Sequence, residues 1–194
     1  DKLAEFRREA ARMGITVEPP SVNTSGVRFE VANGAIHYAL AAVKGVGEEA
    51  ARAIVEARGR RPFASLADFA ERVSPKAVNR RTYEQLVAAG AFDTLDRDRA
   101  KLVAGAERVL AHAASRENEA RSGQTNFFGG GAADTIDLPA AEPWSLVERL
   151  TREHAAVGFY LSGHPLDDYG EALQRLSVPN FAEFARFVKS GASH

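Results

Sequence analysis

The chain is organised around residues 40–58, which read Leu-Ala-Ala-Val-Lys-Gly-Val-Gly-Glu-Glu-Ala-Ala-Arg-Ala-Ile-Val-Glu-Ala-Arg. An apolar run ends at Lys44, two glycines enclose Val46, and the residues after Gly47 place apolar side chains at helical spacing. Because glycine accepts positive φ, the turn at Gly45 and Gly47 can direct successive N–H groups outward at the start of a helix whose dipole favours an anion. The stretch therefore predicts a phosphate-binding turn that leads into a helix.

The composition limits the class of protein. The chain has 194 residues, of which 45% are hydrophobic, with no cysteine and a formal net charge of −1. This is a globular composition for one large domain or two small ones. The lack of cysteine excludes disulfides and thiolate metal sites and fits a reducing, cytoplasmic location. No apolar run is long enough to span a bilayer, so we expect no membrane partner. Because the chain starts at Asp1 rather than Met, we expect a piece of a longer protein.

The remaining patterns predict a mainly α fold with a small β-hairpin. Residues 27–31 alternate apolar and polar side chains, Asn33-Gly34 supplies a favoured two-residue turn, and residues 36–40 return. Residues 123–143 have glycines and prolines without a core-forming period, which predicts a mobile linker. Helical spacing predicts helices over residues 1–13, 48–58, 66–73, 80–89, 98–119, 144–161, 167–176 and 181–189.

Basic residues gather near the glycine turn. Residues 58–81 contain seven Lys and Arg against only Asp68 and Glu71. Most charge runs are solvated surface, and a lone Gly-x-Gly is a weak signal. A glycine turn and a cationic surface would nevertheless serve the same ligand, which favours contacts with a nucleic-acid backbone, provided that Glu48 and Glu49 face away. The candidate DNA-binding residues are Lys44, Gly45, Val46, Gly47, Lys76, Arg80 and Arg81.

Other binding and catalytic classes lack their sequence requirements. A Walker loop needs Gly-Lys-Ser/Thr and a dinucleotide fingerprint needs a third glycine in a βαβ unit, and neither occurs. The histidines do not have metal-ligand spacing, and no catalytic residue is predicted. The aromatic pair Phe127-Phe128 either packs onto neighbouring helices or anchors a short peptide contact, with Gln124 at the rim of a partner's pocket.

Several motifs occur in an order that is similar to a known family. Residues 40–58 resemble the first hairpin of a helix-hairpin-helix DNA-binding module, and residues 65–95 resemble its tandem partner, although the second hairpin lacks Gly-x-Gly. Together with residues 12–23 and 158–166, they resemble the bacterial replicative DNA polymerase III alpha subunits, which are C-family polymerases.

The resemblance implies four regions. They are the end of the fingers region (1–43), a tandem helix-hairpin-helix module (44–120), a flexible clamp-binding segment and linker (121–143), and a helical segment leading to the next domain (144–194). The fold class is then a tandem helix-hairpin-helix helical domain.

The resemblance also implies partners. These are double-stranded DNA bound without sequence specificity, the sliding clamp (beta subunit), and other polymerase III holoenzyme subunits. The implied clamp-binding residues are Gln124, Thr125, Asn126, Phe127 and Phe128. The full-length protein is implied to be a DNA-directed DNA polymerase with Mg²⁺ at a palm site that precedes this region, so no cofactor is expected here. Two alternatives are an error-prone paralogue and a non-catalytic, protein-binding helical scaffold.

Overall fold

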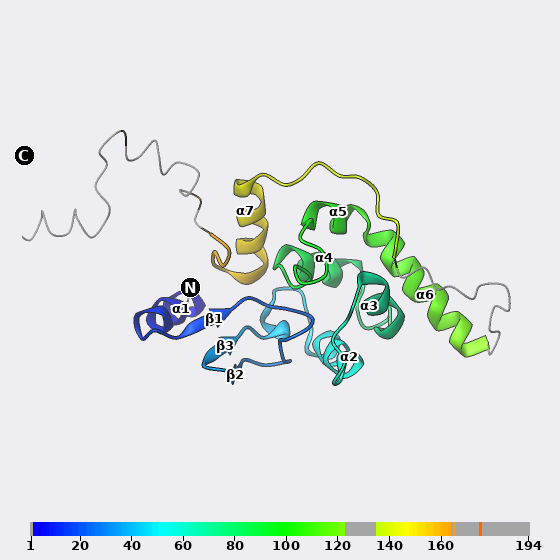
Figure 1. The fold of residues 1–194 in the computed structure, drawn as a ribbon, viewed down its shortest axis with the longest axis horizontal. Coiled ribbons are helices and arrows are strands. Elements are labelled where there is room, and N and C mark those ends of the chain that lie inside the picture. The colour runs from blue at the N-terminus through cyan, green and yellow to red at the C-terminus, as the bar shows by residue number, and fades with distance from the viewer. Residues whose placement is uncertain (1, 123–134, 164, 166–174, 176–194) are drawn as a thin grey trace, which may run out of the picture. The chain divides into compact units, whose positions relative to one another are not determined.

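The computed structural model describes residues 2–122, 135–163, 165 and 175, and it divides into a unit formed by residues 1–162 and a second unit from residue 163 onward (Figure 1). The elements of the first unit are α1 (Lys2–Arg12), β1 (Thr16–Glu18), β2 (Glu30–Ala32), β3 (Ala35–His37), the 3-10 helix η1 (Leu40–Ala42), α2 (Glu48–Arg58), α3 (Leu66–Arg72), α4 (Arg80–Ala88), α5 (Arg99–Ala104), α6 (Ala106–Ser122) and α7 (Leu146–Val157). The predicted mainly α fold is confirmed. Within the described ranges, no helix combines the length and the apolar character needed to cross a bilayer.

The small sheet contains the predicted hairpin and one further strand. The strand order is β1-β3-β2, with β2 antiparallel and β1 parallel to β3. Asn33 and Gly34 have φ of 52° and 76°, as a two-residue hairpin turn requires. Each strand has three residues, so β2 and β3 are shorter than the segments 27–31 and 36–40 that the sequence pattern predicted. Strand β1 was not predicted because three residues cannot display a period.

Polar side chains cap the N-termini of α3, α4, α5 and α7. Ser65 and Asn79 each accept a hydrogen bond from an N–H in the first turn of α3 and α4, and Asp98 and Ser145 do the same for α5 and α7. Gly158 ends α7 in the left-handed region, at φ 98°. The helices predicted over 66–73, 80–89 and 144–161 are therefore present, with shorter ends. Those predicted over 167–176 and 181–189 fall outside the described residues, apart from residue 175.

The single helix predicted over 98–119 is wrong, because the chain forms two helices that meet at Gly105. The side chain of Leu138 packs against this junction, and a Cβ at residue 105 would collide with it. Apolar periodicity continues across the break because α5 and α6 both face the same core, so the pattern alone could not show it.

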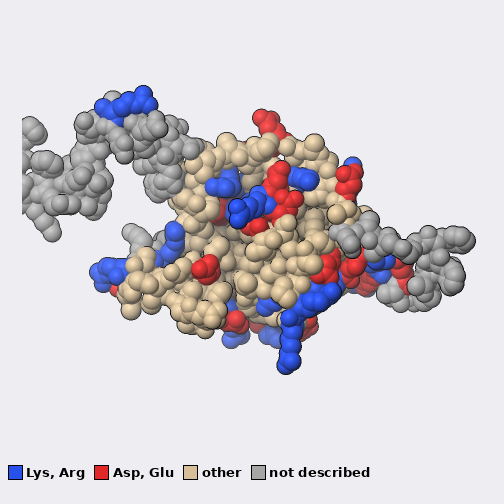
Figure 2. All heavy atoms as spheres, viewed as in Figure 1, with Lys and Arg blue, Asp and Glu red and all other residues tan. Residues whose placement is uncertain are grey.

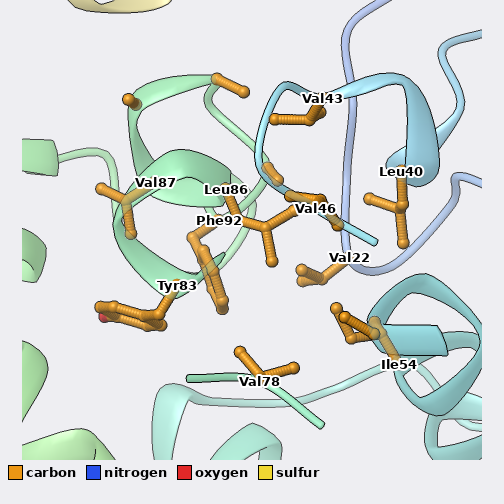
Figure 3. Close-up of a cluster of buried hydrophobic side chains, with 14 of the residues drawn as sticks. Val22, Leu40, Val43, Val46, Ile54, Val78, Tyr83, Leu86, Val87 and Phe92 are labelled. Carbon is orange, nitrogen blue, oxygen red and sulfur yellow. The ribbon is translucent and has the colours of Figure 1, made fainter. Parts of the chain in front are cut away.

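One hydrophobic core lies beneath the two helical hairpins, residues 40–58 and 65–95. Figure 3 shows Val46 from the glycine turn among side chains of α2 and α4, including Ile54 and Leu86, and of the segments next to them. Val78 and Phe92, which flank α4 in the sequence, belong to the same cluster. The two hairpins therefore share their interior, which fixes the first turn relative to helix α4.

Candidate nucleic-acid interface

The glycine turn, residues 44–47, joins η1 to α2. Gly45 has φ 83°, as predicted, so an L side chain would be strained there. Gly47 has φ −71° and ψ 157° as the N-cap of α2, so the expectation of positive φ at this position is wrong. A Cβ added at Gly47 would meet no atom within 4 Å, which means that the space above the helix start is open.

Three contacts hold the turn in place. The side chain of Val46 is buried at 5% exposure, and its N–H donates to the Val43 carbonyl at 3.0 Å. The Lys44 N–H donates to the Ala156 carbonyl of α7 at 2.8 Å. The Thr82 hydroxyl of α4 donates to the Gly45 carbonyl at 3.4 Å. Val46 therefore serves the predicted site as an anchor rather than as a contact.

The first turn of α2 presents N–H groups to the surface. Among the described residues, no acceptor faces the N–H groups of Gly45, Gly47, Glu48 and Glu49, and these four residues are exposed. Unsatisfied N–H groups at the start of a helix carry partial positive charge and can donate to an anion. The arrangement can therefore bind a phosphate without side-chain chemistry.

The Glu48 carboxylate is engaged along the helix. Its Oε1 lies 2.7 Å from Arg52 Nη2 and 3.7 Å from Arg28 Nη2. The hydrogen bond and charge of Arg52, together with the charge of Arg28, hold the pKa of Glu48 below its usual value. The two guanidinium groups therefore balance the negative charge that this residue adds beside the turn.

Two cations accompany the exposed N–H groups. Arg81, in the first turn of α4, is exposed, and its Nε lies 3.9 Å from the position that a Cβ on Gly45 would occupy. Lys44 is exposed within the turn itself. In the part of the chain that the structure describes, neither side chain has a carboxylate partner.

The other predicted DNA-binding cations are paired with acids of neighbouring elements. Lys76 Nζ lies 3.3 Å from Glu117, on α6. Arg80 pairs with Glu84 at 2.8 Å and with Glu107 at 2.5 Å. The structure thus brings Lys44, Gly45 and Arg81 together and leaves Lys76 and Arg80 neutralised.

Three other arginines of the basic run, Arg58, Arg61 and Arg72, bind groups of this chain, whereas Arg60 is exposed. Arg58 donates to two backbone carbonyls, and Arg61 and Arg72 each lie 2.9 Å from an oxygen of Asp68. Burial alone would raise the pKa of Asp68, but a backbone N–H and these two guanidinium groups outweigh it and lower that pKa. Figure 2 shows red and blue atoms side by side in the upper part of the face drawn. The sequence overestimated the cationic surface.

The second hairpin differs from the first in its backbone. Asn79 accepts a hydrogen bond from the Thr82 N–H at 3.0 Å and so occupies the start of α4. The N–H groups of Lys76 and Val78 donate to Ser74. The start of α4 therefore lacks the open space that lies above the glycine turn, in keeping with the absence of Gly-x-Gly from the second hairpin.

The predicted clamp-binding residues, Gln124 to Phe128, lie outside the described residues. The described end of the same region, residues 135–143, includes Ile136 and Leu138, which pack against the core although no core period was recognised there. Arg108 on α6 holds Asp137 at 2.9 Å.

Sequence reasoning missed the support of the turn by Thr82 and Ala156. Thr82 follows Arg81, so its proximity could have been inferred once the two hairpins were packed together. Ala156 acts through its backbone carbonyl, which any residue could supply, so no sequence signal existed for it.

The sequence of this chain matches known proteins. A family profile described as "Helix-hairpin-helix motif" matches residues 14–102. The chain is 44% identical over 194 residues to the protein named "DNA polymerase III subunit alpha" of Caulobacter vibrioides, covering 99% of this chain and 17% of that protein.

Two further relatives bear the same name. The protein of Thermus aquaticus is 42% identical over 190 residues, covering 97% of this chain and 15% of the relative. The protein of Xylella fastidiosa is 36% identical over 182 residues, covering 91% and 15%. This chain therefore spans about a sixth of the length of the curated relatives it matches. Its similarity to them along nearly its whole length shows that the chain is homologous to one segment of the DNA polymerase III alpha subunits.

Proposed function

We propose that this chain binds the sugar-phosphate backbone of duplex DNA, without sequence specificity, through the glycine turn (residues 44–47) and Arg81. The observation that carries the proposal is the set of exposed N–H groups at the start of α2 that have no partner among the described residues, next to the guanidinium of Arg81. Phosphate oxygens accept such hydrogen bonds whatever the base sequence.

The turn is organised before any ligand arrives. Val46 is buried, and the backbone of Lys44 and Gly45 is held by α7 and α4. A preformed site loses little conformational freedom on binding, which favours affinity from few contacts. Because Lys76 and Arg80 are paired with carboxylates, we expect the contact with DNA to be centred on the first hairpin.

We also propose that residues Gln124 to Phe128 bind the sliding clamp, as the family resemblance implies. The proposal rests on a glutamine followed by an aromatic pair. A weak contact would suffice, since a protein already held on DNA meets the clamp at high effective concentration. For the full-length protein we propose DNA-directed DNA polymerase activity, with Mg²⁺ held by residues outside this chain.

Substitution at Gly47 tests the DNA-binding proposal. Gly47→Leu adds a side chain in the open space above the start of α2, at a backbone conformation that leucine accepts. We expect at least about a tenfold loss of affinity for two duplexes of unrelated sequence, because the side chain would occupy the phosphate position. Because leucine is a poorer N-cap than glycine, the free energy of unfolding should fall by about 1 kcal/mol, which leaves the chain folded. Fluorescence anisotropy of labelled duplexes measures the affinity.

The control is Lys76→Gln, which removes a cation that already has a partner and should leave the affinity unchanged. Equal affinity of Gly47→Leu and the parent chain would overturn the proposal. The alternative of a protein-binding scaffold predicts duplex binding that is weak in the parent and insensitive to both substitutions.

A further inference from the structure

A buried ion pair joins helix α5 to helix α7. Arg99 is 6% exposed and Glu153 is 0% exposed, and Arg99 Nη1 lies 3.2 Å from Glu153 Oε2. Arg99 also binds both carboxylate oxygens of Asp93, at 2.9 and 2.7 Å, and donates to the Ala88 carbonyl at 3.1 Å. Because a buried charge is costly to leave unpaired, this network fixes α7 against the end of α4.

The second oxygen of Glu153 binds the chain that follows α7. Glu153 Oε1 accepts hydrogen bonds from the N–H groups of Leu161 and Ser162, at 2.5 and 2.8 Å. Gly158 turns the chain so that these groups can face back toward the helix. Both carboxylate oxygens are therefore occupied, and this one side chain joins α7 to α5 and to the chain that follows α7.

The same helix ends against the glycine turn. The Ala156 carbonyl accepts from the Lys44 N–H at 2.8 Å, and the Val157 carbonyl accepts from the Tyr38 hydroxyl at 3.3 Å. Burial raises the pKa of Tyr38 to about 12, so this phenol keeps its proton at ordinary pH. Ala156 follows Glu153 by three residues, which places both on one side of the helix.

We infer that Glu153, held by Arg99, is a positioning residue for the phosphate-binding turn. It sets where α7 ends, and the end of α7 holds the Lys44 N–H and so the backbone before Gly45. Loss of the ion pair should loosen the turn although neither side chain touches it. The expected effect on DNA binding rests on the proposed function, whereas the effect on the turn does not.

Glu153→Gln in the full 194-residue chain tests the inference. Glutamine keeps the size of the side chain and an accepting oxygen but removes the charge that faces Arg99. We expect amide hydrogen exchange at Lys44 to accelerate about tenfold or more relative to the Tyr83 amide, which donates to Asn79 in the second hairpin. A loss of global stability alone, acting on two amides that exchange through global unfolding, would accelerate both rates equally and leave their ratio unchanged. The dissociation constant for duplex DNA should rise about threefold to tenfold.

Glu148→Gln is the matched control, because it removes an exposed carboxylate on the same helix whose partner is Arg152. It should change neither the exchange ratio nor the affinity. If Glu153→Gln does not fold, Arg99→Lys keeps the charge but loses the planar fork, and the same ratio is measured.

An unchanged exchange ratio in a folded Glu153→Gln or Arg99→Lys chain would overturn the inference. An increased ratio with unchanged DNA affinity would support the positioning of the turn and contradict the proposed DNA-binding role of that turn. The two proposals therefore fail separately.

Discussion

Arg81 and Arg80 are adjacent in the sequence, but of the two only Arg80 has a carboxylate partner among the described residues, and this difference gives a quantitative prediction. Arg80 pairs with Glu84 and Glu107, whereas Arg81 lies beside Gly45 with no carboxylate partner among the described residues. We expect Arg81→Gln to remove one phosphate contact and Arg80→Gln to remove none. The pair is a matched test because both positions lie in the first turn of α4.

The size of the effect follows from counterion release. Each neutralised phosphate contributes about 0.9 to the slope of log K against log salt. Contacts by Lys44 and Arg81 thus give a slope of about −1.8, and Arg81→Gln should reduce it to about −0.9. Between 50 and 200 mM salt, the parent chain should lose about twelvefold in affinity and the variant about threefold to fourfold. With the two affinities taken as equal at 1 M salt, the difference of about 0.9 in slope makes the variant bind about eightfold more weakly than the parent at 100 mM salt.

Anisotropy titrations of a labelled duplex at four or more salt concentrations measure the slope. Arg80→Gln should reproduce the parent slope, and a second duplex of unrelated sequence should give the same values. Equal slopes for Arg81→Gln and the parent would refute the assignment of Arg81. A loss of slope in Arg80→Gln as large as that in Arg81→Gln would refute the argument that ion pairing withdraws Arg80 from the interface.

Three further predictions concern single features of the chain. Gly45→Ala and Gly34→Ala both place alanine at positive φ and should each lower the free energy of unfolding by about 1–2 kcal/mol in denaturant titrations, but only Gly45→Ala should also weaken duplex binding. Replacement of Phe127 and Phe128 by alanine should abolish binding to purified sliding clamp in a pull-down and leave duplex affinity unchanged; retained clamp binding would contradict the assignment. The pKa of Asp68 is lower in the folded state than in the unfolded state. Its contribution to stability is therefore complete above the unfolded-state pKa and is lost as the pH falls through the folded-state pKa. Asp68→Asn should reduce the loss of stability below about pH 5, and an unchanged dependence of the unfolding free energy on pH would contradict this prediction.

The sequence predicted the parts of the fold and of the interface that depend on local conformation. Gly45 needs positive φ, Asn33-Gly34 needs a hairpin turn, and α2 begins after Gly47, each of which follows from a few adjacent residues. The family resemblance is confirmed by relatives that share 36–44% identity with this chain. The predicted contacts of Gln124 to Phe128 with a clamp stay a prediction.

The sequence could not show which cations are free. Lys76 is neutralised by Glu117 of α6, which is remote in the sequence, and Arg80 is neutralised in part by Glu107. Pairing of this kind depends on how helices pack, so counting charges along residues 58–81 overestimated the surface available to DNA. The hydrogen bond from the Lys44 N–H to the Ala156 carbonyl could not be predicted from the sequence either, because it joins two backbone groups that are far apart in the chain.

Helices α6 and α7 belong to one compact unit, and this has a topological consequence for the stretch between them. Whatever course residues 123–134 take, both of their attachment points lie on the same body. A pulling force applied to residues 123–134 is therefore shared between α6 and the segment that leads to α7. Cleavage of one peptide bond in this stretch leaves the parts before and after it packed together. We expect a chain nicked within this stretch to elute as a single particle, and new termini placed there by circular permutation to preserve the fold.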